Sequence, residues 1–184
     1  MSQALQKPSF AYDVFISYLR KDIVSARALE KALENYAPPK DLPVPQRRLV
    51  IFRDEEDFSG VEYNQPLRGH LENSAEMLVI CSPHARASDF VSDEICLFTE
   101  MRGAQHIIPV LLSGIPNDEA HRPEHEEQKA FPRCMRELME MPLAASFLDL
   151  DPSKDKFYKG VFKSPWYTVL ANIYGVRDYL FIKV

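Results

Sequence analysis

The chain is poor in glycine, and the glycines that it has stand far apart. Only six occur among 184 residues, and none are spaced as in a P-loop or a G-x-G-x-x-G dinucleotide motif. The sequence also contains no C-x-x-C pair and no G-x-S-x-G motif. These absences exclude a phosphate site cradled by glycine backbone, and with it nucleotide binding in the Rossmann manner.

Positive charge and long apolar runs are lacking as well. The formal net charge is −5, whereas duplex binding usually needs a basic face, so we expect no direct nucleic-acid partner. The longest apolar runs, such as residues 107–112, are much shorter than the ~20 residues that span a bilayer. The first residues lack the apolar core of a signal peptide. We therefore expect a cytoplasmic chain with no membrane partner.

Cysteines are few, and one zinc-like pattern occurs. Cys81, Cys96 and Cys134 are odd in number and widely spaced, so we expect buried free thiols in a reducing compartment. Residues 121–125, HRPEH, match the H-x-x-E-H zinc pattern. Pro123 would break the helix that must place both histidines on one face, so we expect a solvated loop there and no metal.

Short apolar runs rich in β-branched and aromatic residues alternate with segments of helical periodicity. Runs of this kind are typical of strands buried on both faces of a sheet. The expected strands are residues 11–18, 49–53, 76–82, 106–112 and 145–150. The expected helices are residues 22–36, 67–74, the segment containing Glu94, 133–141 and 164–176. The alternation predicts an α/β fold with a parallel sheet covered by helices on both faces.

We expect one domain over residues 11–176, after a flexible lead-in at 1–10 and before a tail or linker at 177–184. A doubly wound sheet of five strands commonly has the flavodoxin-like order 2-1-3-4-5. In that order, ligands bind outside the carboxyl ends of the first and third strands.

The loops that would converge at that edge are residues 17–22, 53–60 and 82–94. Glu94 is thereby placed at the rim of a predicted cleft. The helix dipole offers a second explanation for Glu94, because it favours acids at the start of any helix. From the pattern alone, both explanations stay open.

Three motifs stand in register, namely YDVFISY (12–18), RLVIFRDEEDFSG (48–60) and LVICSPHARASDFVSDEI (78–95). Their order and spacing resemble the Toll/interleukin-1 receptor (TIR) domain, with its first strand, its BB loop and its S-x-W-x-x-x-E motif. Here that last motif is Ser88-x-Phe90-x-x-x-Glu94, with phenylalanine in place of the usual tryptophan. The resemblance is close over residues 11–150 and looser to 176. FPRCMRELM (131–139) also resembles bacterial TIR domains that precede larger signalling or defence proteins.

The resemblance implies one of two kinds of function. Animal receptor and adaptor members are mostly scaffolds that assemble with other TIR domains. Many bacterial and plant members cleave NAD⁺ at the nicotinamide–ribose bond, releasing nicotinamide with ADP-ribose or a cyclic ADP-ribose, and they need the glutamate that aligns with Glu94.

We expect the enzymatic kind: an NAD⁺ nucleosidase, a hydrolase or cyclase in bacterial antiphage immunity, with NAD⁺ as substrate and no cofactor. The resemblance implies activation by assembly with other TIR domains, as a homo-oligomer or filament, and a fused sensor or oligomerisation domain. The alternative is a non-enzymatic TIR scaffold. A flavodoxin-like phosphoacceptor domain would need acids clustered at the ends of strands one and three, where only Asp13 lies nearby.

The resemblance and the chemistry of the side chains give candidate roles. Glu94 is the expected catalytic residue, because a carboxylate stabilises the oxocarbenium-like ribose formed when nicotinamide leaves. Aromatic rings would stack on nicotinamide or adenine, guanidinium groups would hold the pyrophosphate, and polar groups would contact a ribose. The expected substrate-binding residues are Tyr18, Arg20, Arg53, Asp54, Ser82 and Phe90. The expected assembly residues of the BB loop are Phe58, Ser59 and Gly60.

Overall fold

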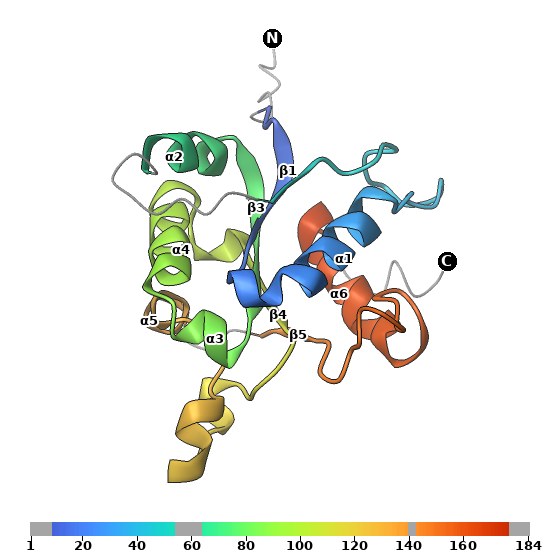
Figure 1. Cartoon of the computed structure of the whole chain (residues 1–184). Coiled ribbons are helices and arrows are strands. Elements are labelled where there is room, and N and C mark those ends of the chain that lie inside the picture. Colours follow the sequence, from blue (N-terminus) through green and yellow to red (C-terminus); the bar gives the residue numbers. More distant parts are fainter. Residues whose placement is uncertain (1–8, 54–63, 140–142, 177–184) are drawn as a thin grey trace.

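A five-stranded parallel sheet forms the centre of the computed structural model, which describes residues 9–53, 64–139 and 143–176 (Figure 1). The strands are β1 (Tyr12–Ser17), β2 (Ile51–Arg53), β3 (Ser74–Cys81), β4 (Ile107–Leu111) and β5 (Ala145–Ser146). All neighbouring strands pair in parallel, and their order is β2-β1-β3-β4-β5. The predicted flavodoxin-like sheet and strand order are therefore confirmed.

Helices cover both faces of this sheet, as expected. They are α1 (Ile23–Glu34), α2 (Asn64–Glu72), α3 (Pro83–Arg86), α4 (Asp89–Arg102), α5 (Arg133–Leu138) and α6 (Lys163–Tyr174). Figure 1 shows α1 and α6 on one face, and α2, α4 and α5 on the other. Short 3₁₀ turns are η1 (Arg20–Asp22), η3 (Ala104–His106), η4 (Asn117–Glu119), η5 (Pro123–Gln128) and η6 (Gly160–Phe162).

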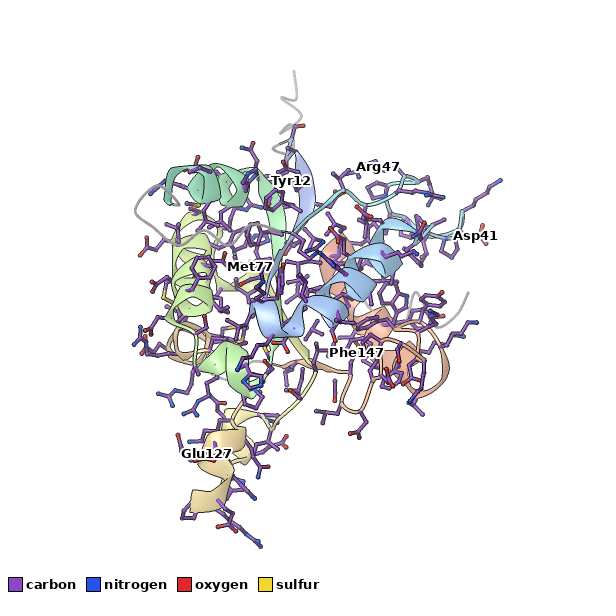
Figure 2. All side chains as sticks on the ribbon, in the orientation of Figure 1. Tyr12, Asp41, Arg47, Met77, Glu127 and Phe147 are labelled. Atoms are coloured by element: carbon purple, nitrogen blue, oxygen red, sulfur yellow. A yellow bond between two sulfur atoms is a disulfide. The ribbon has the colours of Figure 1, made fainter. Side chains whose placement is uncertain are left out.

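Two apolar layers arise from the alternation of side chains along the central strands. In β3, Leu78 and Ile80 point to the layer under α1 and α6, whereas Met77 and Val79 point to the layer under α2, α4 and α5. This is the period of two that an extended strand imposes, and burial on both faces explains the continuous apolar run. Figure 2 shows the side chains of both layers, with Met77 in one and Phe147 in the other.

Trp166 is a core residue and is almost fully buried. It lies in the layer under α1 and α6, with its ring centroid 6.1 Å from that of Tyr36 in an edge-to-face arrangement. α6 ends at Gly175, whose φ of 63° is left-handed, a conformation that glycine adopts without a side-chain clash.

The expectation of three free thiols is wrong for two of them. Cys96 of α4 and Cys134 of α5 form a disulfide, with their Cα atoms 5.7 Å apart. They are 38 residues apart in the sequence, and only the packing of α5 against α4 brings them together. Cys81 is free and buried, and burial raises the pKa of its thiol, so it is held as a neutral apolar group.

Two further features concern membranes and metals. Within the described ranges, no helix is both long enough and apolar enough to cross a bilayer. Nor do these ranges bring three or more His, Cys, Asp or Glu side chains together as a metal would require. In the HRPEH segment, His121 lies before Pro123, the residue at which η5 begins.

Candidate functional site

The carboxyl ends of β1 and β3 meet at one edge of the sheet, where Glu94 of α4 contacts the last residue of β1. Ser17 closes β1 and lies opposite Val79 in the register with β3. Its hydroxyl donates a hydrogen bond of 2.5 Å to Oε2 of Glu94. Ser17 is 1% exposed and Glu94 is 3% exposed. The hydrogen bond therefore joins two buried groups that are 77 residues apart in the sequence.

The position of Glu94 within α4 tests the explanation by the helix dipole. α4 begins at Asp89, and the Ser88 hydroxyl caps it by accepting a 3.3 Å bond from the Val91 backbone N–H. Glu94 is thus the sixth residue of the helix, beyond the first turn in which the helix dipole favours an acid. Asp89 occupies the dipole-favoured place instead. The explanation of Glu94 as an acid at a helix start is therefore wrong.

Burial also corrects the expectation that Glu94 stands at the rim of a cleft. A carboxylate enclosed among apolar neighbours is unfavourable unless hydrogen bonds compensate its lost hydration. The Ser17 hydroxyl supplies one such bond, from the strand end that the helix packs against. Neither the preference of glutamate for the solvent-exposed surface nor its helix propensity explains why this carboxylate is buried at the carboxyl edge of the sheet.

A second polar pair, Asp22 and Ser82, lies where the chain leaves β1 and β3. The Ser82 hydroxyl donates a 2.7 Å bond to Oδ2 of Asp22 and accepts a 3.1 Å bond from the Ala85 backbone N–H, which caps α3. Burial raises the pKa of Asp22, while the bond from Ser82 and the nearby His84 act in the opposite direction. The predicted contact of Ser82 with substrate stays a prediction, although its hydroxyl already serves two partners.

The sequence indicated Asp22 only as the first residue of the helix expected at 22–36, and its side chain makes no capping bond to α1. Its role as a half-buried partner of the loop after β3 was missed. The available signal was its place in residues 17–22, one of the loops expected to converge at this edge.

Tyr18 and Arg53 lie together at the ends of β1 and β2. Arg53 Nη1 donates a 3.2 Å bond to the Tyr18 hydroxyl, and the guanidinium carbon is 5.8 Å from the centroid of the Tyr18 ring. Arg53 Nε donates a 2.8 Å bond to Oε2 of Glu30 on α1. The Arg53 side chain is 3% exposed, so it ties β2 to α1. Its binding of a pyrophosphate stays a prediction, and Glu30 is a partner that the sequence pattern did not reveal.

The remaining predicted residues are exposed or undescribed. Arg20 is exposed on η1, and Phe90 in the first turn of α4 is 41% exposed. Asp54, Phe58, Ser59 and Gly60 lie outside the described residues, so their predicted roles stay predictions. The described part of the site thus joins Ser17 with Glu94, Asp22 with Ser82, and Tyr18 with Arg53.

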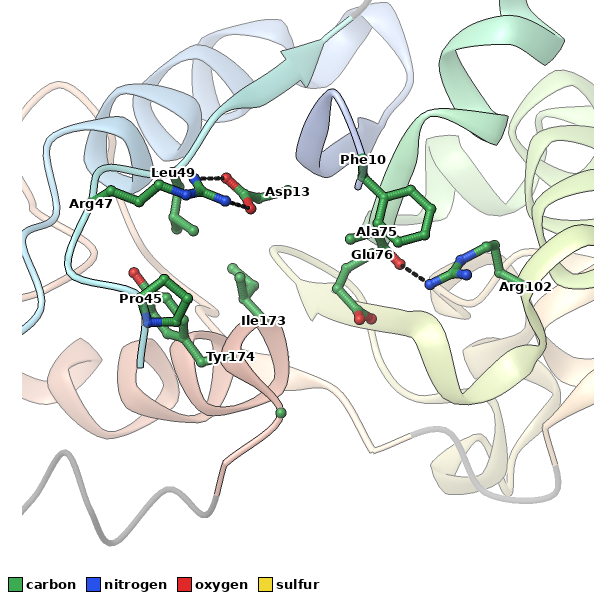
Figure 3. A pocket seen from close by; sticks show the side chains of 11 residues that line it. Phe10, Asp13, Pro45, Arg47, Leu49, Ala75, Glu76, Arg102, Ile173 and Tyr174 are labelled. Atoms are coloured by element: carbon green, nitrogen blue, oxygen red, sulfur yellow. Dashed lines mark hydrogen bonds and ion pairs between the residues drawn. The ribbon is translucent and has the colours of Figure 1, made fainter. Parts of the chain in front are cut away.

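A cavity of about 380 Å³ lies at the opposite edge of the sheet, beside the amino ends of β1 and β3 (Figure 3). On one side of it, the Asp13 carboxylate binds Arg47 through two contacts of 2.6 Å. On the other side, the Arg102 guanidinium lies 4.2 Å from the centroid of the Phe10 ring, next to Glu76. Asp13 is therefore remote from the Ser17 end of β1, which contradicts the expectation that it lies near the ends of strands one and three.

The profile of the TIR domain family matches residues 14–133, which is more than half of the chain. The chain belongs to the TIR domain family. Its Ser17 and Glu94 therefore belong to a TIR domain, at the edge of the sheet where the loops of that family's three motifs leave the strands. Among curated proteins, none matches the chain.

One solved structure shares this fold, and two others match less closely. A metazoan TIR-STING receptor from C. gigas, in complex with 2',3'-cGAMP, matches with a TM-score of 0.57 and 18% identity, over 94% of this chain and 42% of that one. A second structure of a C. gigas TIR-STING receptor gives a TM-score of 0.46 and 20% identity, over 77% of this chain and 44% of that one. The TIR domains of the activated Roq1 resistosome, which recognises the effector XopQ, give a TM-score of 0.35 and 15% identity, over 93% and 78%. This TIR domain spans less than half the length of the TIR-STING chains.

Proposed function

We propose that this TIR domain cleaves NAD⁺ at the bond between nicotinamide and ribose, with Glu94 as the catalytic carboxylate. The observation that carries the proposal is the buried hydrogen bond between Ser17 and Glu94 at the carboxyl edge of the sheet. This edge is where ligands bind in doubly wound α/β folds. Membership of the TIR family, with the Ser88-x-Phe90-x-x-x-Glu94 pattern, supports the choice of substrate.

The proposed reaction needs little acid–base chemistry in its first step. The nicotinamide ring of NAD⁺ is cationic, so the C1′–N bond breaks with its electron pair leaving on nicotinamide, and no proton is required. The ribose becomes an oxocarbenium-like cation, which a fixed carboxylate stabilises more strongly in a site that excludes water. Addition of water to C1′, with loss of a proton, then gives ADP-ribose, whereas attack by an adenine nitrogen gives a cyclic product.

Ser17 contributes by orienting the carboxylate. Its bond to Oε2 fixes the rotation of the Glu94 carboxyl group relative to the end of β1. Preorganised charge of this kind stabilises a developing cation without rearranging during the reaction.

The exposed neighbours supply binding groups for the rest of the substrate. The Phe90 ring, 41% exposed at the start of α4, would stack on a planar base, although it lacks the indole N–H of tryptophan. The exposed guanidinium of Arg20 has the geometry to bind the pyrophosphate.

Assembly is the proposed means of activation. Glu94 is almost fully buried in the single chain, so a ribose reaches it only after a neighbouring part of the site moves. Contact with further copies of the TIR domain, as an oligomer or filament, would provide that change, and a fused sensor domain would trigger it in bacterial antiphage defence.

The test is nicotinamide release by purified protein at high concentration with a crowding agent. Wild type should release nicotinamide with ADP-ribose or a cyclic product, and Glu94→Ala should release neither. Glu100→Ala is the matched control, because Glu100 is an exposed acid on the same helix. If Glu94→Ala keeps wild-type turnover, or if wild type shows none in its assembled form, the proposal is refuted.

A scaffold function is the second candidate, and the exposure of Phe90 favours it. An aromatic ring that is 41% exposed at the start of a helix serves a protein contact as well as a stacking contact. In that case Phe90→Ala should abolish self-assembly, measured by light scattering, while no variant shows NAD⁺ turnover.

A further inference from the structure

A basic cavity lies beside the first turn of α4, on the side of α5. Its volume is about 330 Å³, at the small end of the ~300–1,000 Å³ usual for ligand pockets. Arg86, Arg133 and Arg136 line it, together with a single acid, Asp89. The chain as a whole has a net charge of −5, so the positive character of this cavity is a local feature.

The three arginines differ in how far they are already occupied. Arg86 donates from Nη1 to the Glu126 carbonyl oxygen at 2.8 Å and from Nη2 to Glu126 Oε1 at 2.6 Å. Arg133 Nε lies 4.0 Å from Glu137 Oε1, and both side chains are exposed, so this pair contributes little. Arg136 is exposed, and its side chain forms no ion pair with any residue in the described ranges.

The walls of the cavity are held in place from both sides. Asn117 donates from Nδ2 to the Phe131 carbonyl oxygen at 3.1 Å and accepts from the Phe131 N–H at 3.0 Å, which fixes the segment before α5. The Cys134 N–H donates a 3.0 Å bond to the Ser92 hydroxyl, so α5 is anchored to α4. The backbone that carries Arg133 and Arg136 is thus set before any ligand arrives, which lowers the entropic penalty of binding.

We propose that this cavity binds a small molecule carrying a phosphate or diphosphate group, through the guanidinium groups of Arg133 and Arg136. Guanidinium groups present parallel N–H donors that match phosphate oxygens, and arginine is accordingly common in such sites. Arg86 adds a third guanidinium when the anion displaces Glu126 from it. The inference goes beyond the proposed NAD⁺ cleavage and does not depend on it.

Occupancy of the cavity bears directly on the helix that carries Glu94. Asp89 lines the cavity and is the first residue of α4, and Phe90 follows it. A bound anion repels the Asp89 carboxylate and attracts the arginines around it. Ligand binding therefore changes the electrostatic forces on the first turn of α4, which includes Phe90. In this way the ligand would regulate the proposed catalytic site nearby.

The experiment is a calorimetric titration of the full chain with sodium pyrophosphate, free of magnesium and at constant ionic strength. We expect saturable binding that is weakened about tenfold or more in Arg136→Ala and in Arg133→Ala, since each loses charge-assisted hydrogen bonds. Arg122→Ala should bind as wild type does, because Arg122 is a 72% exposed arginine outside the cavity. Glu126→Gln should bind more tightly, since it removes the negative charge that competes with the anion for Arg86.

Three results would overturn the inference. One is the absence of saturable binding by wild type. Another is equal weakening in Arg122→Ala and Arg136→Ala, which would show general attraction by surface charge. The third is loss of binding in Arg20→Ala with retention in Arg136→Ala, which would place the anion on η1. Glu94→Ala should bind pyrophosphate normally, so a failure of the proposed enzymatic function leaves this result unaffected.

Discussion

Replacing Ser17 by alanine removes the hydroxyl that holds Glu94, and the structure gives the size of the effect. Both side chains are buried, and the bond is a short one, 2.5 Å, to an acidic group. Hydrogen bonds to charged groups contribute roughly 1.5–3 kcal/mol to stability. Because the site is buried, bulk water does not replace the lost hydroxyl as a donor to Glu94. We therefore expect Ser17→Ala to lower the free energy of unfolding by about 1.5–3 kcal/mol.

Urea denaturation measures this change, with a double-mutant cycle to assign it to the pair. The substitution Ser17→Ala should lose most of its effect in a Glu94→Ala background, because the acceptor is already absent there. Ser164→Ala, at an exposed serine of α6, should change the free energy of unfolding by less than about 0.5 kcal/mol. If Ser17→Ala is equally destabilising with and without Glu94, the two residues are not coupled and the reasoning fails.

Three further predictions concern other parts of the chain. Reduction of the Cys96–Cys134 disulfide, or Cys96→Ser, should lower the free energy of unfolding by about 4 kcal/mol, because the unfolded chain gains entropy when the loop opens. Equal urea midpoints with and without reductant would contradict this prediction. Burial raises the pKa of Asp22, so its protonated form is favoured in the folded state. The free energy of unfolding of wild type relative to Asp22→Asn should accordingly be highest below 3.8, the ordinary pKa of an aspartate, and fall as the pH rises through the higher pKa of the folded state. Urea titrations at several pH values measure this difference, and a constant difference would refute the prediction. Phe90→Trp restores the indole N–H at an exposed position, so it should lower the KM for NAD⁺ severalfold with little change in the unfolding midpoint; an unchanged KM would show that this ring does not contact the substrate.

The sheet could be predicted from the sequence because its strands are buried on both faces. Continuous apolar runs such as β3 are recognisable without any knowledge of their neighbours, and the alternation with helices implies parallel order. The weakest prediction was the strand expected at residues 145–150. Only Ala145–Ser146 pairs as β5, since the chain turns at Asp149, whose φ of 65° is incompatible with an extended strand.

The candidate site could be predicted only in part, because its decisive contacts join distant elements. The sequence placed Glu94 and the ends of β1 and β3 at one edge, and the structure agrees. It could not show that Ser17 would be the partner of Glu94, nor that Arg53 would turn to Glu30. Such pairings depend on how helices dock on the sheet, and periodicity within one element carries no information about that.

The central claim is that Glu94 does chemistry, and the most direct measurement is the rate of nicotinamide release by Glu94→Gln. Glutamine has the shape of glutamate and keeps an acceptor for Ser17, but it carries no charge to stabilise an oxocarbenium ion. The account predicts a fall in kcat of roughly 100-fold or more, with assembly and the unfolding midpoint close to wild type. A Glu94→Gln protein that assembles and releases nicotinamide at the wild-type rate would contradict the account, and Glu94 would then be a structural acid of α4.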